Sequence, residues 1–367
     1  MSAAAPVQET TPKAHLLGKT LASGWTLVER LDRSKGSTGG TFGIGYKATK
    51  GNEIAFVKAI DFVEAMRSPN LLAEMSKLGN IANFEKDVLE YCTTKGMSKV
   101  LRYIGHEYIS YNDSDDPLSR VSCLIMEAGT HDLRRLLNLN RNGLVSCGWN
   151  LHVLQDVSLA IAQLHRGNIA HQDIKPSNVI AVQEKNLNDT NSMKVGDLGR
   201  VVRRDQAGPF DSHPWPGDMR YSPPERWYGF VPPDWCDSRE AADAYMLGSL
   251  LIFLFTGATL QSLVVNYIPI SFRLDNWAGK FDQDLLPVLV NAHVRVLHEH
   301  LLPQLMPEIA DGVMGIARAL TQPDPTIRGD TNARRQVGRP VGIDRIHNKF
   351  SALSLTCMAI ERGKGKQ

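Results

Sequence analysis

Hydrophobic and polar residues alternate in short runs over roughly the first third of the chain. Runs of this kind favour β-strands, and turns that are rich in Gly, Ser and Thr or that contain Lys-Gly-Asn separate them. The predicted strands cover residues 25–31, 43–48, 53–60, 100–109 and 121–127. Between the third and fourth strands, residues 62–92 have helical spacing with interruptions at 68–70 and 79–80. We therefore expect an antiparallel meander with one inserted helical segment.

The pattern changes after Gly129, where long helical runs replace most strands. These runs cover residues 132–139, 149–166, 241–256 and 285–302. We predict an α+β fold of two lobes, a small antiparallel β lobe ahead of a larger helical lobe, which a chain of this length can form. The predicted divisions are a flexible leader at 1–22, the β lobe at 23–129, the helical lobe at 130–330 and a C-terminal extension at 331–367.

Cysteine content and the apolar stretches exclude some classes of protein. The five cysteines are odd in number and have no CxxC spacing. This argues for reduced thiols in a cytoplasmic protein, and against a disulfide framework or a zinc site. The N-terminal residues lack the apolar core of a signal peptide. The uncharged stretch at 244–272 contains Gly, Gln, Asn and Pro, so we interpret it as a buried helix and expect no membrane span.

The C-terminal extension is basic and amphipathic. From Thr331 onward it contains eight Lys or Arg residues and two acidic residues, whereas the net charge of the whole chain is +2. We expect this charge to be solvated rather than to bind nucleic acid. Five apolar residues recur at the spacing of one helix face: Ile346, Phe350, Leu353, Cys357 and Ile360. We expect this face to dock on the body of the protein, with a partner or an anionic surface as the alternative.

The strongest chemical signal is the segment 169–178, Ile-Ala-His-Gln-Asp-Ile-Lys-Pro-Ser-Asn, with an Asp-Leu-Gly further along the chain. Transfer of a phosphoryl group from ATP to a hydroxyl needs a carboxylate to orient the hydroxyl and a cation near the migrating phosphate. It also needs two oxygen ligands that hold Mg²⁺ on the phosphates. Asp173, Lys175, Asn178 and Asp197 supply these groups in that order.

These motifs resemble the catalytic loop and the magnesium-binding loop of protein kinases, in the Ser/Thr-type form with Lys two residues after the Asp. The resemblance extends over about residues 23–330. It implies a two-lobed kinase fold in which Asp173 orients the acceptor hydroxyl and Lys175 stabilises the migrating phosphoryl group. Asn178 and Asp197 would then bind Mg²⁺.

Upstream, the resemblance implies a nucleotide site. Gly40 and Gly43 end a Gly-rich turn between two predicted strands, where backbone N–H groups can approach phosphates closely. Lys58 matches the strand lysine that holds the α- and β-phosphates. Its helix partner matches Glu85, and Glu74 is a second candidate because the connecting segment is long.

The end of the last predicted strand of the β lobe resembles the interlobe hinge of kinases. There, backbone groups of Glu127 and Gly129 would bond the adenine, and the Met126 side chain would lie at the back of the pocket. An ordinary strand-to-helix connection is the alternative interpretation of the same residues.

Three later features match protein kinases and are missing from small-molecule kinases of the aminoglycoside type. The segment 217–225 resembles the substrate-docking loop, and Asp243 resembles the helix aspartate that secures the catalytic-loop backbone. Arg328 matches the arginine that pairs with the glutamate of that loop, here Glu225. These features favour a protein substrate.

The chain departs from the kinase pattern in its activation segment. Gln172 stands where most regulated kinases have an Arg that binds a phosphate, and Ser212 is the only Ser or Thr between Gly199 and Ser222. We therefore expect activity without phosphorylation of this segment. Asp218 replaces the Thr that bonds the catalytic Asp and Lys in Ser/Thr kinases. Together with the catalytic-loop motifs it resembles the Wee-type kinases, which phosphorylate tyrosine, so the identity of the acceptor stays open.

Another departure concerns two neighbouring strands of the β lobe. Phe56 stands where kinases have a small Ala, and Gly45 stands where they have Val. We interpret this as a volume-conserving exchange in which Phe56 and Gly45 face each other and the ring lies over the adenine.

The sequence as a whole predicts a protein kinase that uses ATP and Mg²⁺ and acts on an unidentified protein, with Ser/Thr favoured over Tyr as the acceptor. Transfer would depend on positioning and on charge neutralisation more than on covalent chemistry. The alternative is a pseudokinase that serves as a nucleotide-sensing or docking module. The unusual Gly-rich turn and Phe56 motivate this alternative, whereas the complete set of polar catalytic residues argues against it.

Overall fold

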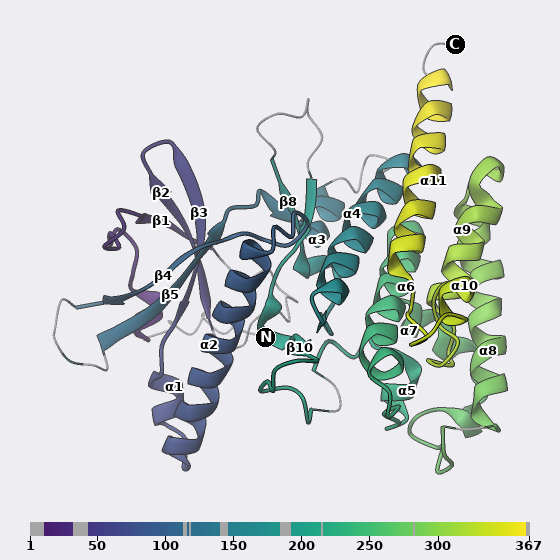
Figure 1. Ribbon diagram of the computed structural model, residues 1–367, viewed down its shortest axis with the longest axis horizontal. Coiled ribbons are helices and arrows are strands. Elements are labelled where there is room, and N and C mark those ends of the chain that lie inside the picture. Colours follow the sequence, from purple (N-terminus) through teal and green to yellow (C-terminus); the bar gives the residue numbers. More distant parts are fainter. Residues whose placement is uncertain are drawn as a thin grey trace, which may run out of the picture. The chain divides into compact units, whose positions relative to one another are not determined.

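The computed structural model describes residues 11–31, 43–112, 116, 119–139, 146–183, 192–213, 216–281 and 283–364. The chain divides into two compact units, Met1–Gly96 with Leu101–Thr130, and Met97–Val100 with His131–Gln367. The first unit contains the larger β-sheet and the second contains most of the helices (Figure 1). This distribution confirms the predicted α+β fold with a small antiparallel β lobe and a larger helical lobe.

The first unit contains a five-stranded antiparallel sheet with the strand order β1-β2-β3-β5-β4. Buried positions alternate with more accessible ones along most of β2 and β3, as expected for strands that turn one face toward a core. Tyr46, Ala48, Val57 and Ala59 belong to that core. The strands are β1 (Thr26–Leu31), β2 (Ile44–Lys50), β3 (Glu53–Ile60), β4 (Tyr103–Ser110) and β5 (Arg120–Glu127).

Residues 11–22 pack against the core of this sheet, so the prediction that residues 1–22 form a flexible leader is wrong for the part that the structure describes. Leu16 is fully buried among core residues. The Tyr46 hydroxyl donates a hydrogen bond of 2.7 Å to the Lys13 carbonyl, and the Lys13 N–H donates one of 2.8 Å to the Asp61 carboxylate. Ala14, Leu16 and Leu21 are buried whereas Leu17 is exposed, a pattern without strand or helix periodicity, so the sequence did not reveal this packing.

Two helices connect β3 to β4 in the first unit, α1 (Val63–Met66) and α2 (Leu71–Thr94). The predicted interruption at 68–70 is confirmed, because Asn70 caps the N-terminus of α2 by accepting a hydrogen bond from the Ala73 N–H. The predicted interruption at 79–80 is wrong, because α2 continues through it. A glycine inside a helix costs only about 1 kcal/mol, and burial of Leu78 and Ile81 on either side offsets that cost.

The second unit is built from helices and several very short strands (Figure 1). Its helices are α3 (Leu133–Leu139), α4 (Cys147–Arg166), α5 (Pro224–Trp227), α6 (Ala241–Thr256), α7 (Leu260–Val264), α8 (Leu285–Val296), α9 (Pro307–Leu320), α10 (Thr331–Arg334) and α11 (Ile343–Lys364). Its strands form a β6-β8-β9 sheet and a β10-β7 pair: β6 (His131–Asp132), β7 (Ile169–Ala170), β8 (Val179–Val182), β9 (Ser192–Val195) and β10 (Val202–Arg203). Strands of two to four residues are too short to show a period of their own in the sequence.

Helix α6 forms the centre of the second unit. Every residue from Ala241 to Ile252 is buried, and the helix ends at Gly257, whose positive φ of 73° suits a glycine. Within the described residues, no single helix has the length and apolarity needed to cross a membrane. A pair bent by 77°, Cys236–Thr256 with Leu260–Tyr267, meets those two criteria jointly.

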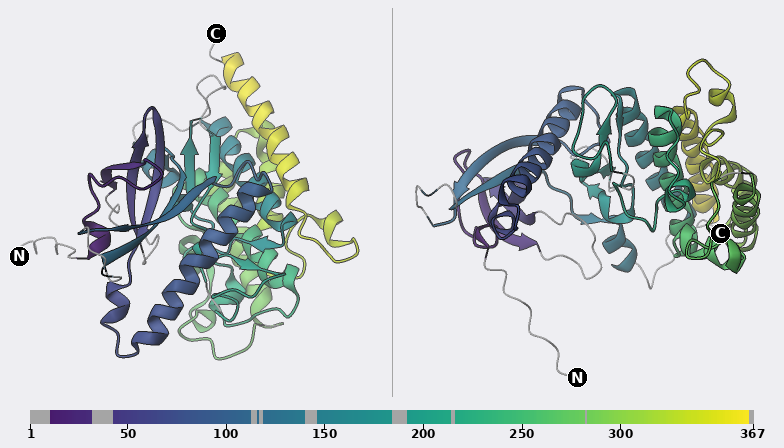
Figure 2. Two further views of the ribbon diagram at one scale, coloured as in Figure 1. Left: turned by 60° about the vertical axis from the view of Figure 1, so that its left-hand side comes forward. Right: turned by 90° about the horizontal axis from the view of Figure 1, so that it is seen from below.

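The C-terminal helix α11 packs along α4 and also contacts α9 (Figure 2). Three of the five stripe residues, Ile346, Phe350 and Cys357, are fully or almost fully buried, and the other two, Leu353 and Ile360, are half-buried. Two glycines permit the close approach: a Cβ at Gly312 would lie 2.7 Å from the Leu353 side chain, and one at Gly148 would lie 2.7 Å from a Glu361 oxygen. The apolar face of α11 therefore docks on the body of the protein, on α4 and α9.

Candidate active site

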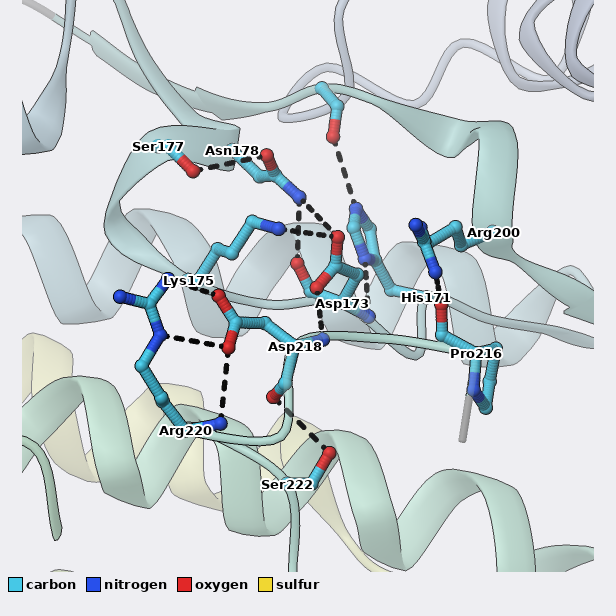
Figure 3. A network of polar contacts seen from close by, with 11 residues as sticks. His171, Asp173, Lys175, Ser177, Asn178, Arg200, Pro216, Asp218, Arg220 and Ser222 are labelled. Atoms are coloured by element: carbon cyan, nitrogen blue, oxygen red, sulfur yellow. Dashed lines mark hydrogen bonds and ion pairs between the residues drawn. The ribbon is translucent and has the colours of Figure 1, made fainter. Parts of the chain in front are cut away.

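Asp173 lies in the loop that joins β7 to the short 3-10 turn at Pro176–Asn178 (Figure 3). Its Oδ2 atom is 2.8 Å from Lys175 Nζ and accepts a hydrogen bond of 3.2 Å from the Asn178 amide. Its Oδ1 atom accepts a hydrogen bond of 2.8 Å from the backbone N–H of Asp218. Two of the predicted catalytic and metal-binding residues, Lys175 and Asn178, thus contact the carboxylate of a third, Asp173.

The environment of Asp173 makes its carboxylate more basic. Burial raises its pKa above the ordinary value for aspartate, and the nearby Asp197 acts in the same direction, while Lys175 partly opposes the shift. A carboxylate with a raised pKa accepts a proton from a hydroxyl more readily than a solvated one. The site therefore has the electrostatics of a proton acceptor.

The β8–β9 hairpin brings Asn178 and Asp197 toward each other. Val179 is paired with Val195, and the Gly196 N–H donates a hydrogen bond of 2.9 Å to the Asn178 carbonyl, so the two residues flank the same end of the hairpin. Asp197 has a left-handed backbone with φ of 55°, which is uncommon for a residue other than glycine and is typical of functional sites.

The donor set of these two residues suits magnesium. Together they present a carboxylate and an amide oxygen, both hard oxygen ligands of the kind that Mg²⁺ prefers when phosphate oxygens complete its coordination. The amide nitrogen of Asn178 is oriented by a 2.8 Å hydrogen bond to the Asp173 carbonyl, which fixes the plane of the amide group. By the chemistry of their side chains, Asn178 and Asp197 could therefore hold Mg²⁺.

The backbone of the catalytic loop is held by the fully buried Asp243 on α6. Its carboxylate accepts hydrogen bonds from the backbone N–H groups of His171, at 2.7 Å, and Gln172, at 2.8 Å. Although burial alone would raise the pKa of Asp243, its hydrogen bond with His165 and the neighbouring His165 and His171 lower it. The predicted role of Asp243 is confirmed.

His165, near the end of α4, is a partner of this carboxylate that sequence analysis missed. Its Nε2 atom is 3.0 Å from Asp243 Oδ2. Burial disfavours the imidazolium, but the hydrogen bond and the charge of Asp243 outweigh burial and raise the pKa of His165. His165 precedes the catalytic-loop motif and belongs to the predicted helix, so no motif pointed to it.

Asp218 contacts the catalytic loop through its backbone N–H, and the charge of Lys175 in that loop also acts on its carboxylate. Its N–H bonds Asp173, whereas its carboxylate accepts hydrogen bonds from the Arg220 guanidinium at 2.7 and 3.0 Å (Figure 3). Burial alone would raise the pKa of Asp218, but Arg220 lowers it to about 2. The neighbouring Gly217 lies so close to the loop that a Cβ there would be 2.1 Å from the Gln172 carbonyl oxygen. A side chain at position 217 would therefore displace the segment.

The predicted pair of Glu225 and Arg328 is confirmed as a buried, two-pronged ion pair. The two guanidinium nitrogens lie 2.8 and 2.7 Å from the two carboxylate oxygens, and both side chains are at most 2% exposed. A planar guanidinium matches a carboxylate in this geometry, which fixes the end of the segment 217–225.

In the first unit, Lys58 on β3 contacts Glu85 on α2. Lys58 Nζ donates hydrogen bonds of 2.8 Å to both carboxylate oxygens of Glu85. Glu74, the other candidate, lies 3.4 Å from Lys77 one turn along the same helix. Glu85 is therefore the partner of Lys58, and the pair fixes the direction of the lysine ammonium group.

The remaining nucleotide residues of the first unit are placed only in part. Gly40 lies outside the described residues, whereas a Cβ at Gly43 would lie 3.0 Å from the Lys58 side chain. The N–H of Glu127 donates a hydrogen bond of 2.9 Å to the Arg102 carbonyl. An adenine contact at that residue would therefore rest on the Glu127 carbonyl. The roles of Gly40, Gly43, Glu127 and Gly129 stay predictions.

Phe56 and Gly45 face each other, as predicted. A Cβ at Gly45 would lie only 2.8 Å from the Phe56 ring, so the ring occupies the space of a side chain at position 45. Phe56 also pairs with Met126 across β3 and β5. The contact of the ring with the adenine stays a prediction.

Comparison with known proteins agrees with this geometry. The protein kinase domain family matches residues 39–267, more than half of the chain. A crystal structure of a kinase domain aligns with a TM-score of 0.55 and 15% sequence identity, covering 86% of this chain and 94% of that chain. The alignment supports a fold of the protein kinase class, and the chain belongs to the protein kinase family.

The curated relatives match only segments of this chain. A Wee1-like protein kinase of Oryza sativa subsp. japonica is 28% identical over 126 residues, 34% of this chain and 21% of the relative. A membrane-associated tyrosine- and threonine-specific cdc2-inhibitory kinase of Drosophila melanogaster is 32% identical over 103 residues, 28% of this chain and 17% of the relative. The inhibitor of nuclear factor kappa-B kinase subunit beta of Mus musculus is 36% identical over 99 residues, 26% of this chain and 12% of the relative. The matches thus span about a fifth or less of each relative.

Proposed function

We propose that this chain is an ATP- and Mg²⁺-dependent protein kinase that transfers the γ-phosphoryl group to a Ser or Thr hydroxyl of another protein. The observation that supports it most is the cluster around Asp173, in which a buried carboxylate contacts Lys175 and Asn178 directly. Purified protein with radiolabelled ATP and a generic protein substrate tests it. Wild type should transfer label and Asp173→Asn should not.

The residues of the chain divide the work of transfer. Asp173 accepts the hydrogen bond of the acceptor hydroxyl and orients it, and its raised pKa helps it take the proton as the bond to phosphorus forms. Lys175, 2.8 Å from Asp173, places a positive charge beside the migrating group. Lys58, held by Glu85, orients the other phosphates of ATP. Mg²⁺ bound to Asn178 and Asp197 would neutralise phosphate charge.

Two residues argue in opposite directions about the acceptor amino acid. Lys175 favours Ser or Thr, whereas Asp218 resembles the Wee-type kinases, which phosphorylate tyrosine. Lys two residues after the catalytic Asp is typical of Ser/Thr kinases. Two of the matched relatives have names that include Wee1-like and tyrosine- and threonine-specific activity. Phosphoamino acid analysis of labelled substrates tests the preference: phosphoserine or phosphothreonine should dominate, and phosphotyrosine as the main product would contradict it.

We also propose that the kinase is active without phosphorylation of its activation segment. Gln172 is fully buried, and its uncharged side chain holds the loop through hydrogen bonds. Its amide donates hydrogen bonds to the Arg239 carbonyl, at 2.9 Å, and to Asp243, at 3.0 Å, and its oxygen accepts one from Arg226. In most regulated kinases an Arg at this position binds a phosphate on the activation segment. Here the Gln172 hydrogen bonds hold the loop in the unphosphorylated protein.

A pseudokinase remains the second candidate, motivated by the Phe56 ring beside Gly45. It would bind nucleotide without transferring label. The same radiolabelled assay separates the two functions, because a pseudokinase would give equal background in wild type and Asp173→Asn.

A further inference from the structure

Residues 11–25 form a strap that lies against the five-stranded sheet of the first unit (Figure 2). We call this segment the N-terminal strap. Its backbone is attached to β1, because the Leu27 N–H donates a hydrogen bond of 2.9 Å to the Lys19 carbonyl. It is also attached to β4, because the Ser23 N–H donates one of 3.1 Å to the Glu107 carboxylate. The strap therefore joins the two edge strands of the sheet.

The start of the strap is tied to Asp61, the residue that follows β3. Asp61 is only 2% exposed. Its Oδ2 atom accepts a hydrogen bond of 2.8 Å from the Lys13 N–H, and its Oδ1 atom lies 3.9 Å from the Lys13 ammonium nitrogen. Oδ1 also accepts a hydrogen bond of 3.3 Å from the Val63 N–H, at the start of α1. One buried carboxylate thus joins the strap, the end of β3 and the first turn of α1.

Asp61 lies between the two elements that carry the pair of Lys58 and Glu85. Lys58 precedes it on β3, and Glu85 follows on α2, the helix after α1. The Lys58 ammonium group is 2.8 Å from both carboxylate oxygens of Glu85, so β3 and α2 must keep a fixed separation for this pair to persist. The chain between the two residues passes through Asp61. A carboxylate that fixes this junction therefore limits the motion of one element against the other.

The strap residue Lys13 also holds β2 beside Lys58. The hydroxyl of the fully buried Tyr46 donates a hydrogen bond of 2.7 Å to the Lys13 carbonyl. The residue before Tyr46, Gly45, is the partner of Lys58 across β2 and β3. Lys13 therefore contacts β2 through its carbonyl and the end of β3 through its N–H.

We propose that Asp61 is a positioning residue of the nucleotide site and that the N-terminal strap is its anchor. By fixing the junction of β3 and α1, Asp61 keeps Lys58 within bonding distance of Glu85. An ammonium group that is already oriented binds phosphate without the entropic cost of ordering a long side chain. The effect on ATP binding rests on the proposed function, whereas the effect on the position of Lys58 does not.

The reactivity of the Lys58 amine measures its position in the full chain without nucleotide. A water-soluble acylating reagent is applied briefly, and peptide mass spectrometry gives the rate of modification at each lysine. Asp61→Asn should raise the rate at Lys58 about threefold to tenfold, because the pair with Glu85 opens more often. The rate at the exposed Lys95 should not change. An unchanged rate at Lys58 in folded Asp61→Asn would overturn the proposal.

Two further variants separate positioning from a general loss of stability. Tyr46→Phe removes only the hydroxyl that bonds Lys13, and it should raise the Lys58 rate by a smaller factor. If Asp61→Asn does not fold, an unchanged rate in Tyr46→Phe overturns the proposal instead. Leu27→Ala removes a fully buried side chain of the same core on β1. It should lower the melting temperature without changing the Lys58 rate, and an acceleration equal to that in Asp61→Asn would defeat the proposal.

Calorimetric titration with MgATP tests the consequence for the nucleotide site. Asp61→Asn should weaken MgATP binding about threefold to thirtyfold in the wild-type background. In the Lys58→Met background the same substitution should have no further effect, because the residue through which Asp61 acts is absent. An equal loss in both backgrounds would contradict action through Lys58. If the wild-type chain does not bind MgATP, the proposed kinase function fails, and the labelling of Lys58 still decides the role of Asp61.

Discussion

At the scale of single residues, the surroundings of Asp173 and Asp243 shift the pKa values of the two carboxyls in opposite directions. Asp243 receives hydrogen bonds from two backbone N–H groups and from His165, which together lower its pKa despite complete burial. Asp173 has fewer such donors and its pKa is raised by burial. One carboxylate is thus fixed as an anion that holds the loop, and the other is tuned to accept a proton.

The pair of His165 and Asp243 predicts a pH-dependent stability. The raised pKa of His165 means that its contribution is complete below the unfolded value of about 6.5 and is lost as pH rises through the folded value. Because the pKa of Asp243 is lowered, this carboxyl stays ionised from pH 6 to pH 9 and its contribution to stability does not change over that range. His165→Gln should cost about 1–3 kcal/mol near pH 6 and less near pH 9, measured by chemical denaturation.

The control for this prediction is His298→Gln, an exposed histidine of the second unit. Its effect should be small at every pH. A loss in His165→Gln that is the same at pH 6 and pH 9 would contradict the ion pair.

Ser212→Ala should leave the specific phosphotransfer activity within about threefold of wild type. Neutral Gln172 gives no charge-assisted receptor for a phosphate, and its contacts to Asp243 hold the loop in either state. The activity of the two purified proteins is compared directly. A tenfold loss that Ser212→Glu restores would show that catalysis depends on an anion at this position.

At the scale of elements, β2 and β3 carry an exchange of side-chain volume. The Phe56 ring fills the space beside Gly45, so neither residue can be changed in isolation without a void or a clash. The same strand carries Lys58, whose ammonium group depends on α2 for its partner. The position of the phosphate-binding lysine is thus set by the packing of a strand pair and one helix.

The exchange predicts a rescue. Phe56→Ala should open a void and weaken ATP binding by about 1–3 kcal/mol, and Gly45→Val in the same chain should recover much of that loss. Gly45→Val alone should clash, since its Cβ would lie 2.8 Å from the ring. Isothermal titration with ATP compares all three variants, and a double mutant no better than Phe56→Ala would refute the exchange.

Local motifs predicted the chemistry of the second unit well, because Asp173, Lys175 and Asn178 lie within six residues of one loop. Contacts between distant segments were harder to predict. Burial of Leu16 and Leu21 depends on a sheet that forms later in the chain, and the choice of Glu85 over Glu74 depends on the register of a helix that runs through Gly79. Arg226 and His165 belong to no motif and acquire their roles only through packing.

At the scale of the whole molecule, the C-terminal extension is part of the second unit. Helix α11 buries Ile346, Phe350 and Cys357 against α4 and α9, and Glu361 accepts a 3.2 Å hydrogen bond from the Gly148 N–H at the start of α4. The basic residues Arg345 and Lys349 lie 3.8 and 2.8 Å from Asp330. These contacts account for the stripe and for part of the surrounding charge.

Deletion of residues 341–367 should lower stability or solubility more than phosphotransfer. Phe350→Ala tests the same contact more finely and should cost about 3–5 kcal/mol, whereas Leu355→Ala, at an exposed position of α11, should cost little. Melting temperatures and activity per folded molecule are compared. A truncated protein that melts like wild type but fails to engage its cellular target would instead make the extension a docking arm.

The central claim is that Asp173 acts on the hydroxyl and Asp197 on the metal. The most direct measurement titrates ATP into Asp173→Ala and Asp197→Ala with and without Mg²⁺, alongside a phosphotransfer assay of both. Both variants should lose phosphotransfer, and only Asp197→Ala should lose most of the Mg²⁺-dependent gain in ATP affinity. Robust autophosphorylation by Asp197→Ala, or equal loss of metal-dependent binding in both variants, would contradict the assignment.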